Sequence, residues 1–191
     1  MIRNPTATRH QSIFNEVSDG MTETFFIGDT HFGHRNILRF DAVRPHRPFD
    51  SIEEHDEELV RRWNSVVSKG DIVWHLGDVA FSSKAVVTAG RLNGMKRLVL
   101  GNHDHYPTAE YLKYFQKVYG AATLKDDIIL THVPVHPEQL ERYRFNIHGH
   151  LHTHCLDDSR YINVSCEQIN LTPVPMEWVL KRTNKLDNAD G

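Results

Sequence analysis

The sequence is short of cysteine, of basic tracts and of long apolar runs, and each absence excludes a class of protein. Its two cysteines, Cys155 and Cys166, are too few for a disulfide framework, so we expect a reducing, cytoplasmic setting. No apolar run approaches the roughly 20 residues of a membrane span, and residues 1–5 lack the apolar segment of a signal peptide. A formal charge of −3 without a Lys/Arg tract does not favour nucleic acid as a partner.

What remains is the composition of an ordinary globular protein with one anomaly. The 191 residues are 39% hydrophobic and 25% charged, which predicts a single domain over 1–191 with a substantial core. Residues 1–20 are predicted to be an N-terminal extension, and residues 184–191 a frayed tail. The anomaly is the 14 histidines, which exceed what packing or solubility requires. Histidine is the commonest metal ligand.

Short apolar runs alternate with helical patterns along the chain. Ser51 and Glu54 have the spacing of a capping box, and apolar residues recur behind them on one helical face, at Ile52, Leu59, Trp63 and Val66. We interpret His55 in this helix as incidental. Further helices are predicted at 83–92, 108–115 and 175–183, and strands at 23–27, 71–76, 96–100, 121–125, 127–130, 145–148 and 161–165. This alternation indicates an α/β fold, in which sites gather at the carboxyl ends of strands.

Five of the predicted strands end in polar groups that bind metals. The stretches are Asp29-Thr30-His31, Gly77-Asp78, Gly101-Asn102-His103-Asp104, His132 and Gly149-His150-Leu151-His152. Taken alone, each could be a polar turn, but their shared position at strand ends favours one site. Imidazole, carboxylate and amide donors suit Mn²⁺, Fe, Zn²⁺ or Ni²⁺ rather than the all-oxygen cages of Ca²⁺. The absence of cysteine from the set argues against a structural zinc site.

The five stretches, in this order, resemble the blocks of the calcineurin-like metallophosphoesterase superfamily, over about residues 24–170. The opening from Asp29 to Ile37 also resembles small bacterial and phage-encoded members. The resemblance implies a two-sheet β-sandwich flanked by helices, with a dimetal site at the strand carboxyl ends. It implies that Asp78 bridges two divalent ions, most simply Mn²⁺. One ion would be held by Asp29, His31 and His152, and the other by Asn102, His132 and His150.

The implied activity is hydrolysis of a phosphate ester by a metal-activated water. His103 is the candidate general acid for the leaving oxygen, with Asp104 orienting its ring. His34, Arg35 and Asn36 are candidate substrate contacts, because a guanidinium matches phosphate bidentately. An equally good interpretation is that Arg35 is solvated on a short helix. His75 and His148 lie inside strands, where we expect core positions or positions behind the ligands.

Two departures from the family pattern bear on the substrate. Val79-Ala80-Phe81 stands where many members carry a further charged residue, and only 17 residues separate His132 from His150. The expected partner is a small phosphate-ester substrate, and the oligomeric state is open. A phosphodiesterase or nuclease acting on cyclic nucleotides or nucleic acid is the alternative enzyme. A non-catalytic scaffold ranks lower, because no ligand and no acid is missing.

Overall fold

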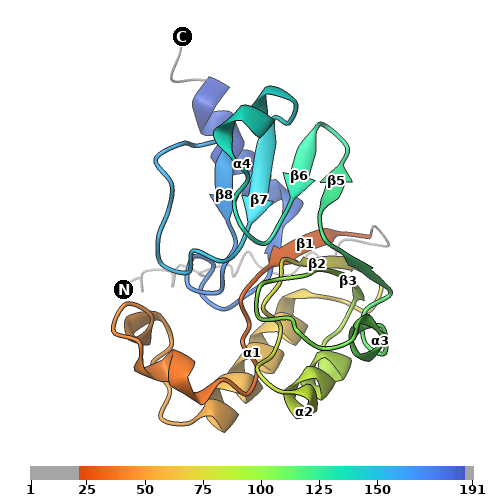
Figure 1. The fold of residues 1–191 in the computed structure, drawn as a ribbon, viewed down its shortest axis with the longest axis vertical. Helices are drawn as coiled ribbons and strands as arrows, with labels where there is room; N and C mark the ends of the chain where they lie inside the picture. The colour runs from red at the N-terminus through yellow and green to blue at the C-terminus, as the bar shows by residue number, and fades with distance from the viewer. Residues whose placement is uncertain (1–21, 188–191) are drawn as a thin grey trace, which may run out of the picture.

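The computed structural model describes residues 22–187, which form two mixed β-sheets flanked by helices (Figure 1). The predicted α/β sandwich is therefore confirmed, and a single doubly wound sheet is excluded. Apolar side chains from both sheets, such as Phe26, Val73, Leu130 and Ile147, belong to one continuous core. The predicted extension at 1–20 lies outside the described residues.

The first sheet has the strand order β4-β3-β2-β1-β9. The strands β1, β2 and β3 are the predicted apolar runs, and the short β4 and β9 at the edges of the sheet were not predicted. β2 pairs in parallel with β1 and β3, β4 pairs in parallel with β3, and β9 is antiparallel to β1. The bounds are β1 Thr24–Ile27, β2 Ile72–His75, β3 Met95–Val99, β4 Lys117–Tyr119 and β9 Val174–Pro175.

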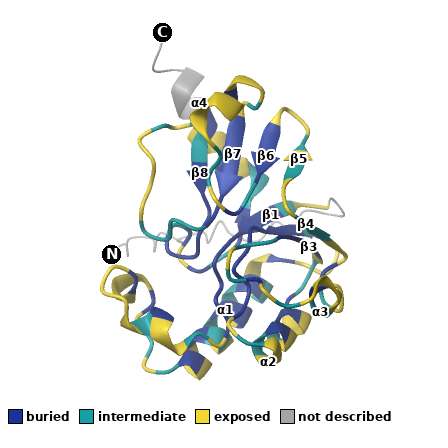
Figure 2. Ribbon diagram, viewed as in Figure 1, coloured by how far each residue is buried: buried dark blue, intermediate teal, exposed yellow. Residues whose placement is uncertain are grey.

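The second sheet has the order β5-β6-β7-β8, and it occupies the upper half of Figure 1. β7 pairs in parallel with β6 and β8, and β5 is antiparallel to β6. The bounds are β5 Ala122–Leu124, β6 Ile128–Leu130, β7 Phe145–His148 and β8 Tyr161–Asn163. The central strands are buried throughout, whereas exposed residues are concentrated in loops and on outer helix faces (Figure 2).

Helices cover the outer side of the first sheet. α1 (Ile52–Val66) begins as predicted, because the Ser51 hydroxyl accepts a hydrogen bond from the Glu54 amide at 3.1 Å. Its apolar face differs at the end, where Val66 is exposed and Val67 is buried. The remaining helices are α2 (Ser83–Val86), α3 (Thr108–Tyr111) and α4 (Met176–Asp187), with 3₁₀ turns η1 (Arg35–Arg39), η2 (Arg44–His46), η3 (Val87–Arg91) and η4 (Pro137–Glu141).

Three details at the chain end and surface complete the fold. α4 runs on to Asp187, and the last four residues of the predicted tail lie outside the described part. No helix within residues 22–187 is long and apolar enough to cross a membrane. Backbone hydrogen bonds from Gly28 to Val164 (2.8 Å) and from Cys166 to Gly28 (3.1 Å) tie the loop after β1 in the first sheet to the segment after β8 in the second. The carboxyl ends of strands from both sheets therefore meet at one place.

Candidate metal centre

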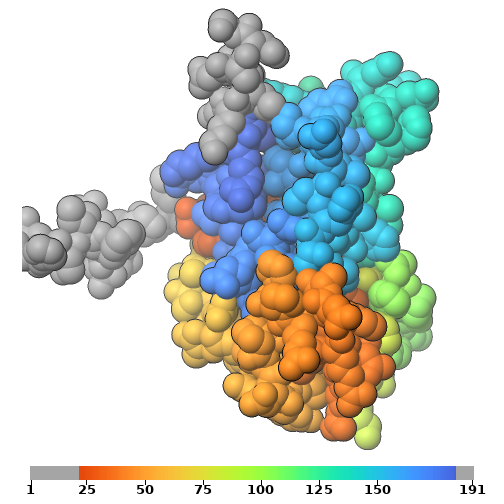
Figure 3. Space-filling model, turned by 90° about the vertical axis from the view of Figure 1, so that its left-hand side faces the viewer, coloured from red at the N-terminus to blue at the C-terminus, as the bar shows by residue number. Residues whose placement is uncertain are grey.

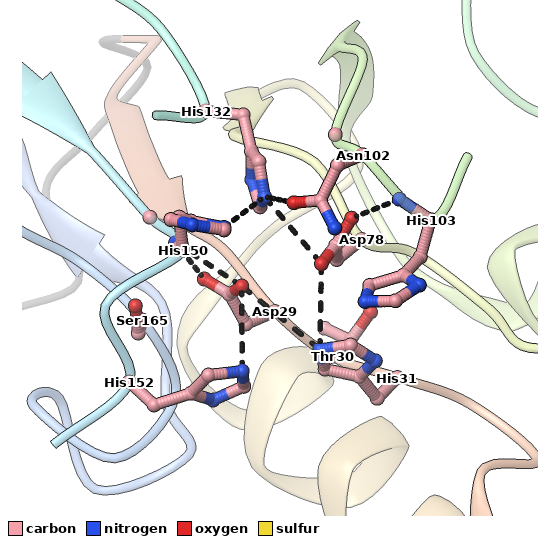
Figure 4. A network of polar contacts seen from close by, with 12 residues as sticks. Asp29, Thr30, His31, Asp78, Asn102, His103, His132, His150, His152 and Ser165 are labelled. Carbon is pink, nitrogen blue, oxygen red and sulfur yellow. Dashed lines mark hydrogen bonds and ion pairs between the residues drawn. The ribbon is translucent and has the colours of Figure 1, made fainter. Parts of the chain in front are cut away.

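All seven predicted metal ligands meet between the two sheets (Figure 4). We call Asp29, His31 and His152 the first group, and Asn102, His132 and His150 the second group. Asp78 lies between them: its Oδ2 atom is 3.6 Å from His31 Nε2 and 3.4 Å from His132 Nε2. One carboxylate oxygen thus faces an imidazole of each group.

Within the first group, Nε2 of His31 and Nε2 of His152 each lie 4.0 Å from Asp29 Oδ1. The three ligand atoms lie within 4.8 Å of one another, close enough to share an ion. Asp29 and His31 are buried, and His152 is partly exposed. A further combination of Asp29, Asp78 and His132 satisfies the same distance. Asp29 and Asp78 therefore both lie close to His132 of the second group.

The second group is more open. His132 Nε2 lies 2.9 Å from Asn102 Oδ1 and 3.2 Å from His150 Nδ1. The other ring nitrogen of His132, Nδ1, donates to the main-chain carbonyl of Leu76 at 2.7 Å, so Nε2 is the nitrogen that faces the other ligand residues. His132 is buried, but Asn102 is exposed. This group therefore faces solvent on one side.

His31 supplies a direct test of whether a metal fits. Both of its ring nitrogens are buried and have no hydrogen-bond partner among the described residues. Burial, and then the charge of Arg47, hold the pKa of His31 well below its usual value, so its imidazole is neutral. A buried imidazole with an unused lone pair is costly unless a ligand satisfies it. The donor set thus fits a divalent transition metal.

The two carboxylates of the centre differ in their electrostatics. Burial raises the pKa of Asp29 to about 6, an effect that the neighbouring His132 and His152 oppose. Burial also acts to raise the pKa of Asp78, but the hydrogen bond and charge of His132 hold that pKa below its usual range. Desolvation is therefore most costly at Asp29, where a cation would relieve it most.

The loops that carry the ligands have unusual backbone conformations. Five ligand residues are in the left-handed region, with φ of 59° at Asp29, 50° at His31, 56° at Asp78, 70° at His150 and 47° at His152. Such angles are uncommon outside glycine and concentrate at functional sites. They turn each chain sharply at the strand end, so that the side chain points back into the cluster.

Glycines allow these loops to approach closely. A Cβ atom at Gly101 would clash with the Asp78 carboxylate, and Gly77 has a φ of +90°. Both positions therefore require glycine. The Gly-Asp and Gly-Asn-His-Asp motifs are in contact through this packing.

The structure corrects the role predicted for Asp104. Its carboxylate accepts hydrogen bonds from the main-chain amides of Asp78 (2.8 Å), Val79 (3.0 Å) and Gly101 (2.8 Å), and from the Tyr111 hydroxyl (3.3 Å). The prediction that Asp104 orients the His103 ring is therefore wrong. Asp104 instead fastens the loop after β2 to the loop after β3.

His103 lies at the edge of the cluster. Its main-chain amide donates to Asp78 Oδ1 at 2.9 Å, and its ring centroid is 5.8 Å from that of His31. The ring also lies 4.9 Å from that of Phe81. His103 is half-buried, so its ring borders the ligands and remains reachable from solvent.

The predicted substrate contacts divide into two cases. The His34 ring stacks on Phe81 with 3.6 Å between centroids and lies 5.4 Å from the His31 ring, so His34 borders the centre. Arg35 begins the short η1 helix and forms an exposed 3.3 Å ion pair with Glu53. This matches the alternative interpretation, in which Arg35 is solvated. Asn36 is exposed on the same turn, and its contact with substrate stays a prediction.

Sequence reasoning missed a buried network behind the first group. Arg47 and Glu167 have fully buried side chains joined at 2.7 Å. The interpretation of His55 as incidental is wrong, because it is completely buried and its Nε2 atom lies 2.8 Å from Arg47. Arg47 stands between two prolines in a loop, where nothing in the sequence signals burial. His75 and His148 are buried as predicted, and His75 contacts Thr30 at 2.9 Å.

Comparison with known proteins agrees with this geometry. The chain is 33% identical to an uncharacterized protein of the archaeon Methanocaldococcus jannaschii over 176 residues, which cover 86% of this chain and 93% of that one. It is 31% identical to the gene 66 protein of Mycobacterium phage L5, over 70% of this chain and 79% of that one. A protein of unknown function from Aquifex aeolicus has a similar fold, with a TM-score of 0.68 and 24% identity, over 84% of this chain and 99% of that chain.

The family model of calcineurin-like phosphoesterases matches residues 23–187, which is nearly all of the described chain. The match spans all five ligand-bearing stretches and both sheets. We conclude that this chain belongs to the calcineurin-like phosphoesterase family.

Proposed function

We propose that this chain hydrolyses a small phosphate ester with two divalent transition-metal ions, most simply Mn²⁺, with Fe, Zn²⁺ or Ni²⁺ as the other candidates. The first group would hold one ion, the second group the other, and Asp78 both. The observation that carries the proposal is the convergence of six N/O ligand residues around Asp78, among them a buried His31 imidazole with no hydrogen-bond partner within the described residues. Bound ions would lower the pKa of a water, orient the phosphate and offset charge on its in-line transition state.

The chain's own residues would supply the rest of the chemistry. Asp78 and Asp29 bring negative charge to the centre, and an imidazole that binds a metal ion does so in its neutral form, through a lone pair. His103 would donate a proton to the leaving oxygen, since its ring borders the ligands from the solvent side. No covalent enzyme intermediate is required.

The test combines metal content with turnover. Protein stripped by a chelator and reloaded with Mn²⁺ should bind about two equivalents by elemental analysis and recover hydrolysis of p-nitrophenyl phosphate. Full activity with one equivalent would contradict the two-ion mechanism. Loss of all metal binding without loss of activity would contradict the metal-dependent function itself.

A phosphodiesterase is the second candidate, and the rim of the site supports it. Phe40 and Phe81 are half-exposed, and both lie beside His34. Exposed rings beside His34, one of which (Phe81) also lies next to His103, would suit a planar leaving group such as a nucleoside. Parallel assays on p-nitrophenyl phosphate, its bis-ester and cyclic nucleotides distinguish the two candidates by their kcat/KM values.

A further inference from the structure

A charged pair is buried where the two halves of the chain meet. Arg47 Nε donates to Glu167 Oε1 at 2.7 Å, and neither side chain is exposed. In Figure 3 the orange segment that follows β1 lies directly against the blue segment from the last third of the chain, as this pair requires. Removing two charges from water is costly, so a buried pair is weak grounds for expecting added stability.

The other nitrogens of Arg47 contact the His55 ring and the main chain of the loop that carries Asp29. Its Nη2 atom donates to the Asp29 carbonyl at 2.6 Å, and its Nη1 atom donates to the Thr30 carbonyl at 3.2 Å. Asp29 is one of the residues held in the left-handed region. The guanidinium therefore fastens the strained turn that aims the Asp29 carboxylate.

Glu167 reaches the first group from the other side. The same Oε1 atom that meets Arg47 lies 3.1 Å from His152 Nδ1. With Nδ1 donating to this carboxylate, His152 presents Nε2 toward Asp29 Oδ1, 4.0 Å away. The second oxygen, Oε2, is buried and has no hydrogen-bond partner in the described part of the chain.

The contacts of Arg47 and Glu167 with ligand residues are made to the first group. The pair touches the side chain of His152 and the main chain at Asp29, which are two of the three residues of the first group. In the second group, the corresponding support for His132 is the Leu76 carbonyl. We propose that Glu167, held in place by Arg47, is a positioning residue that sets the metal affinity of the first group alone. This inference rests on the proposed two-metal function.

The experiment is a Mn²⁺ titration followed by calorimetry. The variant is Glu167→Gln, which keeps the volume of the side chain and removes its charge. The matched control is Glu58→Gln, because Glu58 pairs with Arg61 and Arg62 at 2.6 and 2.7 Å on the surface of α1, away from the ligands. We expect Glu167→Gln to weaken one of two ions about 10- to 100-fold, the usual range for outer partners of metal ligands. The other ion and the control should stay within about twofold of wild type.

A double-mutant cycle separates positioning from general support. If Glu167 acts through His152, then Glu167→Gln should cause little further loss of affinity in a His152→Ala background. Additive losses, or equal weakening of both ions in the single variant, would overturn the inference. An unchanged titration would also overturn it.

Two further measurements cover the case in which Glu167→Gln does not fold. Glu167→Asp keeps the charge opposite Arg47 but shortens the reach to His152, and it should show the same selective loss. In wild-type protein, the His152 Nδ1 proton should give a low-field NMR signal that is absent from folded His152→Gln; its absence from wild type would overturn the inference. Fewer than two ions in wild-type protein would contradict the proposed function, whereas a non-selective loss contradicts only the positioning role.

Discussion

The two ligand groups are built in different ways. In the first group, Asp29 and His31 are buried and stand in front of charged side chains that are themselves buried. In the second group, Asn102 is exposed and His132 is steadied by a main-chain carbonyl. The two groups have similar ligand types, but the residues behind the ligands differ between them. We therefore expect two bound ions to differ in affinity, and different substitutions to weaken each of them.

Asp78 faces both groups, so its replacement should affect both in the same way. We expect Asp78→Asn to weaken both ions and to lower kcat/KM on the order of 10³-fold or more, since ion-mediated stabilisation is worth several kcal/mol. Asparagine tolerates the left-handed φ of 56° at this position. Asp126→Asn is the matched control, because Asp126 is exposed and has a φ of 62°. Loss of one ion with the other unaffected would show that Asp78 does not bridge.

His103 belongs to neither group, so its replacement should leave the binding of metal to both groups unchanged. We expect His103→Ala to keep both ions and lose turnover by about 10²- to 10⁴-fold on alkyl phosphates, which need a proton on the leaving oxygen. The loss should be smaller on p-nitrophenyl phosphate, whose leaving group departs readily. The exposed His105, two residues further on, provides the control variant His105→Ala. Equal losses on both substrates would assign His103 to charge stabilisation instead.

Asp104 supports the loop that carries Asn102 of the second group, so its replacement should lower stability. Asp104→Asn replaces an acceptor of three main-chain hydrogen bonds, including one from Gly101 beside Asn102. We expect a loss of about 1–3 kcal/mol in the free energy of unfolding. At roughly 2–4 °C per kcal/mol, thermal melts would resolve it. An unchanged melting temperature with a large loss of turnover would restore Asp104 to a catalytic role.

Arg35 should have the smallest effect, because it lies outside both groups. Its ion pair with Glu53 is exposed at both ends, and such pairs contribute little to stability. We expect Arg35→Ala to change KM for p-nitrophenyl phosphate by less than about twofold, because its side chain is exposed and pairs with Glu53. Arg39→Ala, on the same η1 turn, is the control. A tenfold rise in KM for Arg35→Ala alone would return Arg35 to the substrate site.

The sequence predicted the ligand-bearing strand ends because local signals repeat there. Each apolar run that ends in a polar group, as at Ile27 before Asp29 or Leu130 before His132, marks both a strand and its carboxyl end. Parallel pairing brings the ends of β1, β2 and β3 to one edge and those of β6 and β7 to another, and the packing of the two sheets then joins the two edges. The ligand geometry follows from local patterns plus a simple rule of topology.

The supporting residues could not be predicted in this way. Arg47 and Glu167 are separated by 120 positions and meet only after both sheets have formed. Arginine and glutamate are exposed in most proteins, so neither residue signals its own burial. Asp104 was placed correctly at the centre, but its partners are main-chain amides, two of them in the loop after β2, which no side-chain motif reveals.

The left-handed ligand residues have a consequence for directed evolution. Glycine adopts a φ of 59° or 70° without steric cost, whereas the aspartate and histidine at positions 29 and 150 do so under strain. A selection that rewards heat resistance alone would therefore accumulate glycine or asparagine at these positions and erase the centre. Directed evolution of this protein for thermal stability therefore has to select for turnover at the same time.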